Sequence, residues 1–203
     1  MKKKKHNTQQ LPYLLPILTF LMVGFLFIIS NSYTPKWNFK WKGIRKEVKD
    51  SVQRLDRIGE ISSDSISQYG YRLDSYFIHK WLIENVKPLE FYKLLDYPNG
   101  TVKAVAYEGL MYNNKVKKYP LFMKSLNDTL AFVYYRSGCI GSGAMLSDYV
   151  INFITNIDHQ APPKYNPPII ELTLEEKEEI LTLFKKRKAK EKYYFEEFYK
   201  IIR

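Results

Sequence analysis

The sequence predicts an all-α fold in three parts: an N-terminal transmembrane helix, a helical body and a long C-terminal helix. Three observations support this prediction. Residues 7–35 carry no charged side chain, and residues 11–29 are almost wholly apolar. In the body, apolar residues recur at helical spacing between charged ones. Near the C-terminus, acidic residues precede basic ones, which is the order that a helix dipole favours.

The apolar N-terminal segment predicts a transmembrane signal anchor over residues 11–30. Nineteen residues at about 1.5 Å each give roughly 28 Å of helix, close to the thickness of a bilayer's hydrocarbon core. A basic tail with four consecutive lysines, residues 1–10, precedes it. The alternative is a cleaved signal peptide, because Ser30 and Ser32 fill the two small positions before a possible cut.

Charge around this segment gives two possible orientations. Four lysines precede it, and six basic residues follow it within residues 36–49. Counting alone favours a cytoplasmic body, but four consecutive lysines are hard to translocate. We therefore expect a single-pass membrane protein with its N-terminus in the cytoplasm and its body outside.

Residues 31–43 are typical of a juxtamembrane segment that meets lipid head groups. Aromatic and basic side chains alternate there, and both types favour the head-group layer. The expected membrane-interface residues are Trp37, Phe39, Trp41, Lys40 and Lys42. A short strand with one apolar face explains the same alternation, because period two is also the strand signature.

The body, residues 44–160, begins with a clear helical stripe. Apolar residues recur at positions 44, 48, 52 and 55 between charged ones, which predicts a helix to about Ile58. A second helix is expected over residues 66–81. Pro88 then opens a short helix, Pro98-Asn99-Gly100 forms a turn, and a third helix runs from Thr101 to Leu110. Helix, tight turn and helix predict an αα-hairpin.

This hairpin resembles a HEAT-like repeat. The residues that carry the resemblance are Leu94, Leu95, Asp96, Pro98, Val102, Lys103, Ala106 and Leu110. A fainter copy follows at Leu126, Asp128 and Val133, without the proline turn or the alanine. The resemblance covers roughly residues 80–156 and implies a short α-solenoid, in which repeats bury their faces by stacking.

The rest of the chain reads as loop, helix, spacer and helix. The glycine-rich stretch at residues 138–143 predicts an inter-helix loop, and residues 144–154 a further helix. Four prolines within residues 161–168 predict a polyproline-type spacer. In the charged C-terminal helix, residues 169–203, Thr173 and Glu176 form a capping-box pair.

Catalytic signals are absent from the sequence. The glycine-rich stretch lacks the lysine of a phosphate-binding loop. Cys139 is the only cysteine, and no histidine stands near it in sequence. Asp158 and His159 are adjacent but have no further ligand at helical spacing. We therefore predict no catalytic, cofactor-binding or metal-binding residue, and no cofactor.

The charge balance points to acidic partners. The net charge is +11, and much of it lies in two runs, one at each end of the chain. The C-terminal run predicts either a solvated helix face or a contact surface for anionic lipid or nucleic acid. Its residues are Lys185, Lys186, Arg187, Lys188, Lys190 and Lys192.

From these observations we expect a membrane-anchored helical module for protein interaction or scaffolding, with a protein partner of unknown identity. The alternatives are an envelope enzyme, whose site assembles only in three dimensions, and a lipid or nucleic-acid binder acting through the basic helix. Function lies in particular sites, so the repeat resemblance alone does not choose among them.

Overall fold

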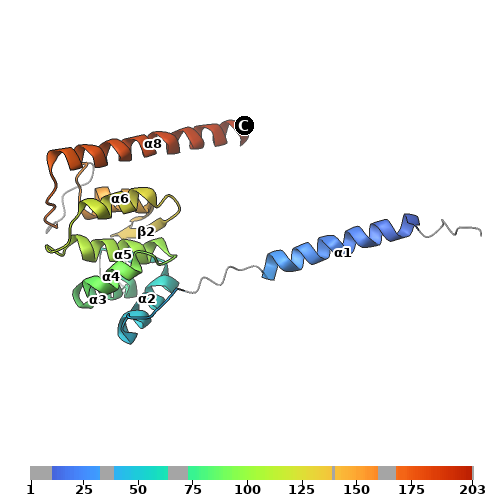
Figure 1. The fold of residues 1–203 in the computed structure, drawn as a ribbon, viewed down its shortest axis with the longest axis horizontal. Helices are drawn as coiled ribbons and strands as arrows, with labels where there is room; N and C mark the ends of the chain where they lie inside the picture. The colour runs from blue at the N-terminus through green and yellow to red at the C-terminus, as the bar shows by residue number, and fades with distance from the viewer. Residues whose placement is uncertain (1–10, 33–38, 64–72, 139, 160–167, 203) are drawn as a thin grey trace, which may run out of the picture. The chain divides into compact units, whose positions relative to one another are not determined.

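The structure, a computed structural model, describes residues 11–32, 39–63, 73–138, 140–159 and 168–202, and of residues 11–15, 27–32 and 192–202 only the backbone. The chain divides into two compact units, Met1–Asn38 and Phe39–Arg203. The first contains one helix, α1, and the second contains all the other elements (Figure 1). The proline-rich spacer expected at residues 161–168 lies almost wholly outside the described residues.

Helix α1 spans Leu11–Ser32 and includes Pro16. No helix in the described parts of the chain combines the length and the apolarity needed to cross a bilayer. The predicted transmembrane signal anchor over residues 11–30, and with it the single-pass membrane localisation, is therefore wrong. That prediction counted the length of the segment, its apolar residues and its lack of charge. Inside the segment, Pro16 lacks a backbone donor and Thr19 adds a hydroxyl, which donates to the Pro16 carbonyl at 2.8 Å.

The second unit is built around α5, Gly100–Met111. This helix buries residues on all its faces, among them Ala104, Ala106 and Tyr107. Such a helix needs neighbours all round. It packs against α2 (Lys46–Ile58), α3 (Asp74–Asn85) and α4 (Pro88–Leu94), and also against the sheet and the π-helix η1 (Tyr149–Ile154).

Three local predictions are confirmed. Helix α2 buries Val48, Val52 and Leu55, the predicted apolar stripe. Helices α4 and α5 pack together as the predicted αα-hairpin. Helix α8 spans Leu174–Ile202, and its predicted capping box is present. The Thr173 hydroxyl accepts from the Glu176 backbone N–H at 3.1 Å, and the Glu176 carboxylate accepts from the Thr173 backbone N–H at 2.9 Å.

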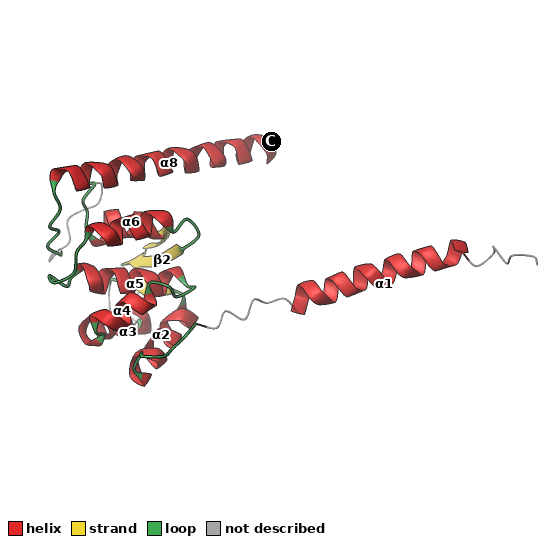
Figure 2. Cartoon of the chain, viewed as in Figure 1, coloured by secondary structure: helices red, strands yellow, loops and turns green. Residues whose placement is uncertain are grey.

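The all-α prediction is wrong, because the second unit contains a three-stranded sheet (Figure 2). Its strands are β1 (Glu60–Ser62), β2 (Phe132–Ser137) and β3 (Ile140–Met145), in the spatial order β1-β2-β3. Strand β1 pairs in parallel with β2, and β2 pairs antiparallel with β3. The predicted inter-helix loop at residues 138–143 instead joins two strands, because residues 140–143 begin β3; Cys139 lies outside the described residues.

The solenoid prediction is also wrong. The fainter repeat copy does not form a second helical hairpin, because Leu126 lies in helix α6 (Tyr119–Asn127) and Val133 lies in strand β2. The physical reason is the period-two pattern after Leu130, where Val133 turns inward and its neighbours Phe132 and Tyr134 turn outward. Family membership in the HEAT-like group stays a prediction.

The helix expected over residues 144–154 is broken into three elements. Ala144 and Met145 end β3, α7 spans Leu146–Asp148, and η1 follows. Within η1 the backbone N–H of Thr155 donates to the Val150 carbonyl at 3.1 Å, the five-residue spacing of a π-helix. The Thr155 hydroxyl donates to the same carbonyl at 2.9 Å. This wider turn follows directly after the buried Asp148.

Candidate functional site

Two of the predicted membrane-interface residues, Phe39 and Trp41, pack against the core of the second unit. Phe39 and Trp41 lie edge to face with ring centroids 4.8 Å apart, and the Phe39 ring also meets Tyr97 at 5.0 Å. Lys40 and Lys42 are exposed, and Trp37 lies outside the described residues. Phe39 and Trp41 therefore pack against the core instead of presenting a free face.

Tyr97 links this aromatic cluster to a polar network. Its hydroxyl donates to Asp56 Oδ2 at 3.0 Å, and Asn99 Nδ2 donates to Asp56 Oδ1 at 2.7 Å. Burial raises the pKa of Tyr97, and the bond to the Asp56 carboxylate raises it further. Asn99 Oδ1 also caps α5 by accepting from the Thr101 backbone N–H at 2.7 Å.

The predicted basic contact residues of α8 fall into two groups, those paired with the body and those that are exposed. Arg187 and Lys188 both pair with Asp148 at the start of η1, with Lys188 Nζ 2.8 Å from Asp148 Oδ2. Lys185, Lys186 and Lys190 are exposed. The side chain of Lys192 lies outside the described residues. Part of the predicted basic surface thus serves to hold α8 on the body.

Helix α8 also docks through apolar side chains. Ile180 and Phe184 are buried, and α8 packs against α6. Tyr119 at the start of α6 donates to Glu179 Oε2 at 2.7 Å. The first half of α8 therefore docks on the body through one apolar face.

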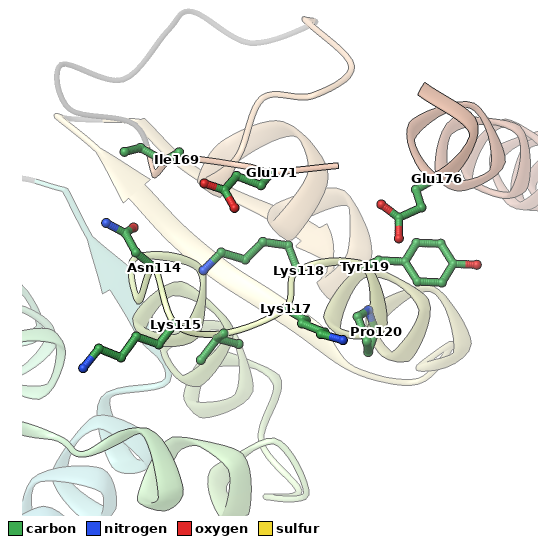
Figure 3. A pocket seen from close by; sticks show the side chains of 10 residues that line it. Asn114, Lys115, Lys117, Lys118, Tyr119, Pro120, Ile169, Glu171 and Glu176 are labelled. Carbon is green, nitrogen blue, oxygen red and sulfur yellow. The ribbon is translucent and has the colours of Figure 1, made fainter. Parts of the chain in front are cut away.

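A pocket of about 460 Å³ opens between the loop before α6 and the segment that leads into α8 (Figure 3). Its size is in the range of small-molecule sites. Lys118 extends across its centre, but this side chain is buried and already bonded. Its ammonium donates to the Leu110 carbonyl at 2.9 Å and the Asn113 carbonyl at 2.6 Å, where α5 ends.

Burial lowers the pKa of Lys118, and the nearby Glu171 carboxylate raises it in part. Glu176, on the opposite wall, is the capping residue of α8. The polar groups at the centre and on this wall therefore already serve the fold. The pocket has the volume of a binding site, but two of its polar side chains, Lys118 and Glu176, already serve the fold.

A second polar pair lies inside the core. His79 Nε2 on α3 lies 2.8 Å from Glu108 Oε2 on α5, and both side chains are largely buried. Neither residue lines the pocket beside α6 or the hollow of about 290 Å³ between α2 and α3. The described residues contain no group of three or more His, Cys, Asp or Glu placed to hold a metal ion.

The β2–β3 hairpin contains an edge strand of the sheet, β3, whose residues are largely exposed. Among the described strands, β3 is hydrogen-bonded only to β2, and its residues 140–143 are exposed. It contains no charge and no proline, the two usual protections of an edge strand. The opposite edge is different, because β1 packs against α3 and its Ile61 and Ser62 are buried.

One face of the hairpin carries exposed aromatic rings. Phe132 and Tyr134 are 43% and 60% exposed and lie edge to face with centroids 5.0 Å apart. Gly143 pairs with Tyr134, and a Cβ added to it would lie 2.5 Å from the Phe132 ring. Only a glycine at this position lets the ring of β2 lie over β3. Leu130, 92% exposed, precedes the strand.

This surface was missed in the sequence. The signal that could have found it is the alternation in residues 132–136, followed by glycines at positions 138, 141 and 143. Comparisons of the chain with protein-family models, with curated proteins and with solved structures find no match.

Proposed function

We propose that the chain is a protein-interaction module whose binding surface is the exposed edge of β3 with the neighbouring rings of Phe132 and Tyr134. The partner is an extended polypeptide segment. It adds to the sheet as a fourth strand, and main-chain hydrogen bonds to β3 supply much of the affinity. Its alternate side chains pack on the two rings.

The observation that carries this proposal is the unprotected edge. Edge strands are normally short, charged, proline-containing or covered, because their free N–H and C=O groups attract other strands. Strand β3 is six residues long and uncharged, and it lies beside exposed apolar side chains. Keeping such an edge carries a risk of aggregation, which a binding role explains.

The two other functions considered have less support. Arg187 and Lys188 of the basic helix are paired with Asp148, so a nucleic-acid or lipid surface there would rest on fewer cations than the sequence suggests. An enzyme needs reactive groups at an accessible cavity, and the buried His79–Glu108 pair lines neither of the two cavities described above.

The proposal is tested by selecting binders from a library of random short peptides displayed on phage. We expect the selected peptides to alternate apolar and polar residues, which is the pattern of a strand with one face on Phe132 and Tyr134. Bound peptide should slow hydrogen exchange at the amides of Gly141, Ser142 and Gly143. Selected peptides without this alternation, or protection confined to the loop before α6, would contradict the proposal.

Two variants locate the binding. Tyr134 carries one of the exposed rings, whereas Ser137 lies at the end of β2, away from the free edge. Tyr134→Ala removes a ring from the binding face and should weaken a selected peptide by roughly tenfold. Ser137→Ala should leave its affinity unchanged.

A further inference from the structure

The identity of the added strand can be argued one step further, on the basis of the function proposed above. We infer that the partner of β3 is a second copy of this chain, paired antiparallel across a two-fold axis that passes through Ser142. The two sheets then form one continuous six-stranded sheet. Two observations support this: the charge of the seam, which is β3 with the residues beside it (130–147), and the register that a two-fold axis allows.

The seam is unusually neutral for this chain. Charged residues make up 26% of the sequence, yet residues 130–147 contain only one, Arg136. That guanidinium is already paired with Glu60 on β1, with Arg136 Nη2 3.1 Å from Glu60 Oε2. At the two-fold axis Ser142 faces its own copy, so a charge at that position would face a like charge. A neutral strand meets this requirement.

Charge also argues against a foreign partner. A chain with a net charge of +11 attracts acidic partners, and a surface made for one would place basic residues along the edge. Strand β3 has none. The edge is therefore matched to a neutral strand, such as its own copy.

The axis must pass through a residue, because residues opposite each other in an antiparallel pair point to the same face. An axis through Ser142 places Gly141 opposite the partner copy's equivalent of Gly143, and Ile140 opposite that of Ala144. The glycines lie on the same face as Phe132 and Tyr134. Their missing side chains leave room for the rings of both copies above the seam, and Ile140, 68% exposed, gains a neighbour.

The test is a charge exchange at the axis. The full chain is studied by sedimentation equilibrium in a non-ionic detergent, which covers the exposed apolar side chains of α1. We expect the unaltered chain to form a dimer. Ser142→Lys and Ser142→Glu should each weaken it, by roughly fivefold, because like charges then face each other. An equimolar mixture of the two variants should restore it, because Lys then faces Glu.

Ser137→Lys and Ser137→Glu are the matched controls, and neither should change the dimer. A dimer that responds equally to the changes at both positions, or that the mixture does not restore, overturns the inference. A monomer at all concentrations also overturns it. If library peptides still protect the β3 amides of that monomer, the proposed function stands and only the second-copy partner is wrong. If they do not, both fail.

Discussion

Arg45 and Glu90 join the starts of two helices that are far apart in the sequence. The Arg45 side chain donates to both carboxylate oxygens of Glu90, with Nη2 2.8 Å from Oε2. Its backbone N–H donates to Oε1 at 2.9 Å, at the position that precedes α2. The backbone N–H of Lys87, which precedes α4, donates to Oε2 at 3.0 Å. One buried carboxylate thus caps both helices.

Replacing this carboxylate should destabilise the protein in a pH-dependent way. Burial alone would raise the pKa of Glu90, but the hydrogen bonds from Arg45 and Lys87 outweigh it and lower the pKa to about 2. The stabilisation is therefore fully present above the ordinary pKa of about 4.5 and is lost as the pH falls towards 2. We expect Glu90→Gln to lower the free energy of unfolding by about 2 kcal/mol at pH 7.

Urea unfolding of both proteins at several pH values measures this effect. The difference between them should narrow as the pH falls from 4.5 towards 2. Glu84→Gln is the control, because Glu84 and its partner Lys80 are both exposed. A Glu90→Gln deficit that does not vary with pH would show that the carboxylate's charge is not the cause.

Asp148 should govern how firmly α8 is held. It is buried and pairs with both Arg187 and Lys188. In Asp148→Asn the largely buried Arg187 keeps only Glu191, 3.3 Å from its Nε, as a counter-charge, and loss of a buried partner typically costs about 3 kcal/mol. We expect faster hydrogen exchange over residues 180–188 than in the unaltered chain. Asp96→Asn, which breaks an exposed pair with Lys124, should change little. Equal exchange in both variants would contradict this role for Asp148.

Gly109 should tolerate no larger residue. A Cβ added there would lie 2.2 Å from the ring of Phe91, which is itself 2% exposed. Gly109→Ala gains up to about 1 kcal/mol of helix propensity, but overpacking of about 1–3 kcal/mol should exceed that gain. Thermal unfolding should show a lower midpoint, and adding Phe91→Leu should recover part of the loss. Gly24→Ala, at a helical position of α1 with open space, is the control. Additive effects of the Gly109 and Phe91 changes would contradict a direct clash.

The free-energy cost of burying the Lys118 ammonium should fall as the pH rises. Its pKa is lowered by burial, so the unfolded chain binds the proton more tightly than the folded one does. Stability relative to Lys118→Met should therefore rise as the pH approaches the ordinary lysine pKa of about 10.5. At pH 7 the variant should still be less stable, by about 1–2 kcal/mol, because the Leu110 and Asn113 carbonyls lose their donor. Guanidinium unfolding at pH 7 and pH 9.5 measures both effects. If the difference in free energy of unfolding between the unaltered chain and Lys118→Met shrinks as the pH rises, the prediction is contradicted.

The features predicted correctly from the sequence depend on residues that lie close together in the sequence. The stripe of α2 and the capping box of α8 are of this kind. The sheet was missed because its parallel pair joins Ile61 to Tyr135, and no local pattern signals such a distant partner. A three-residue strand such as β1 is also too short to show a period.

Gly100 shows how a correct residue can be given an incomplete reason. The sequence pattern places it in the turn Pro98-Asn99-Gly100. In the structure it begins α5, and a Cβ there would lie 2.1 Å from the Phe132 carbonyl oxygen. Its role is to let a strand approach the helix, and the sequence gives no sign of that strand's position. The candidate surface on β3 was missed for the same reason.

The parallel pairing of β1 with β2 has a consequence for synthesis. At roughly 5–20 residues per second, several seconds separate the appearance of Glu60 from that of its partner Tyr134. During this interval α2, α3, α4 and α5 can pack, because their contacts lie within the emerged chain. Strand β1 must wait without a partner, since its place in the sheet is next to β2. A released chain truncated before residue 130 should therefore hold a helical intermediate, and the sheet should form only when β2 is present.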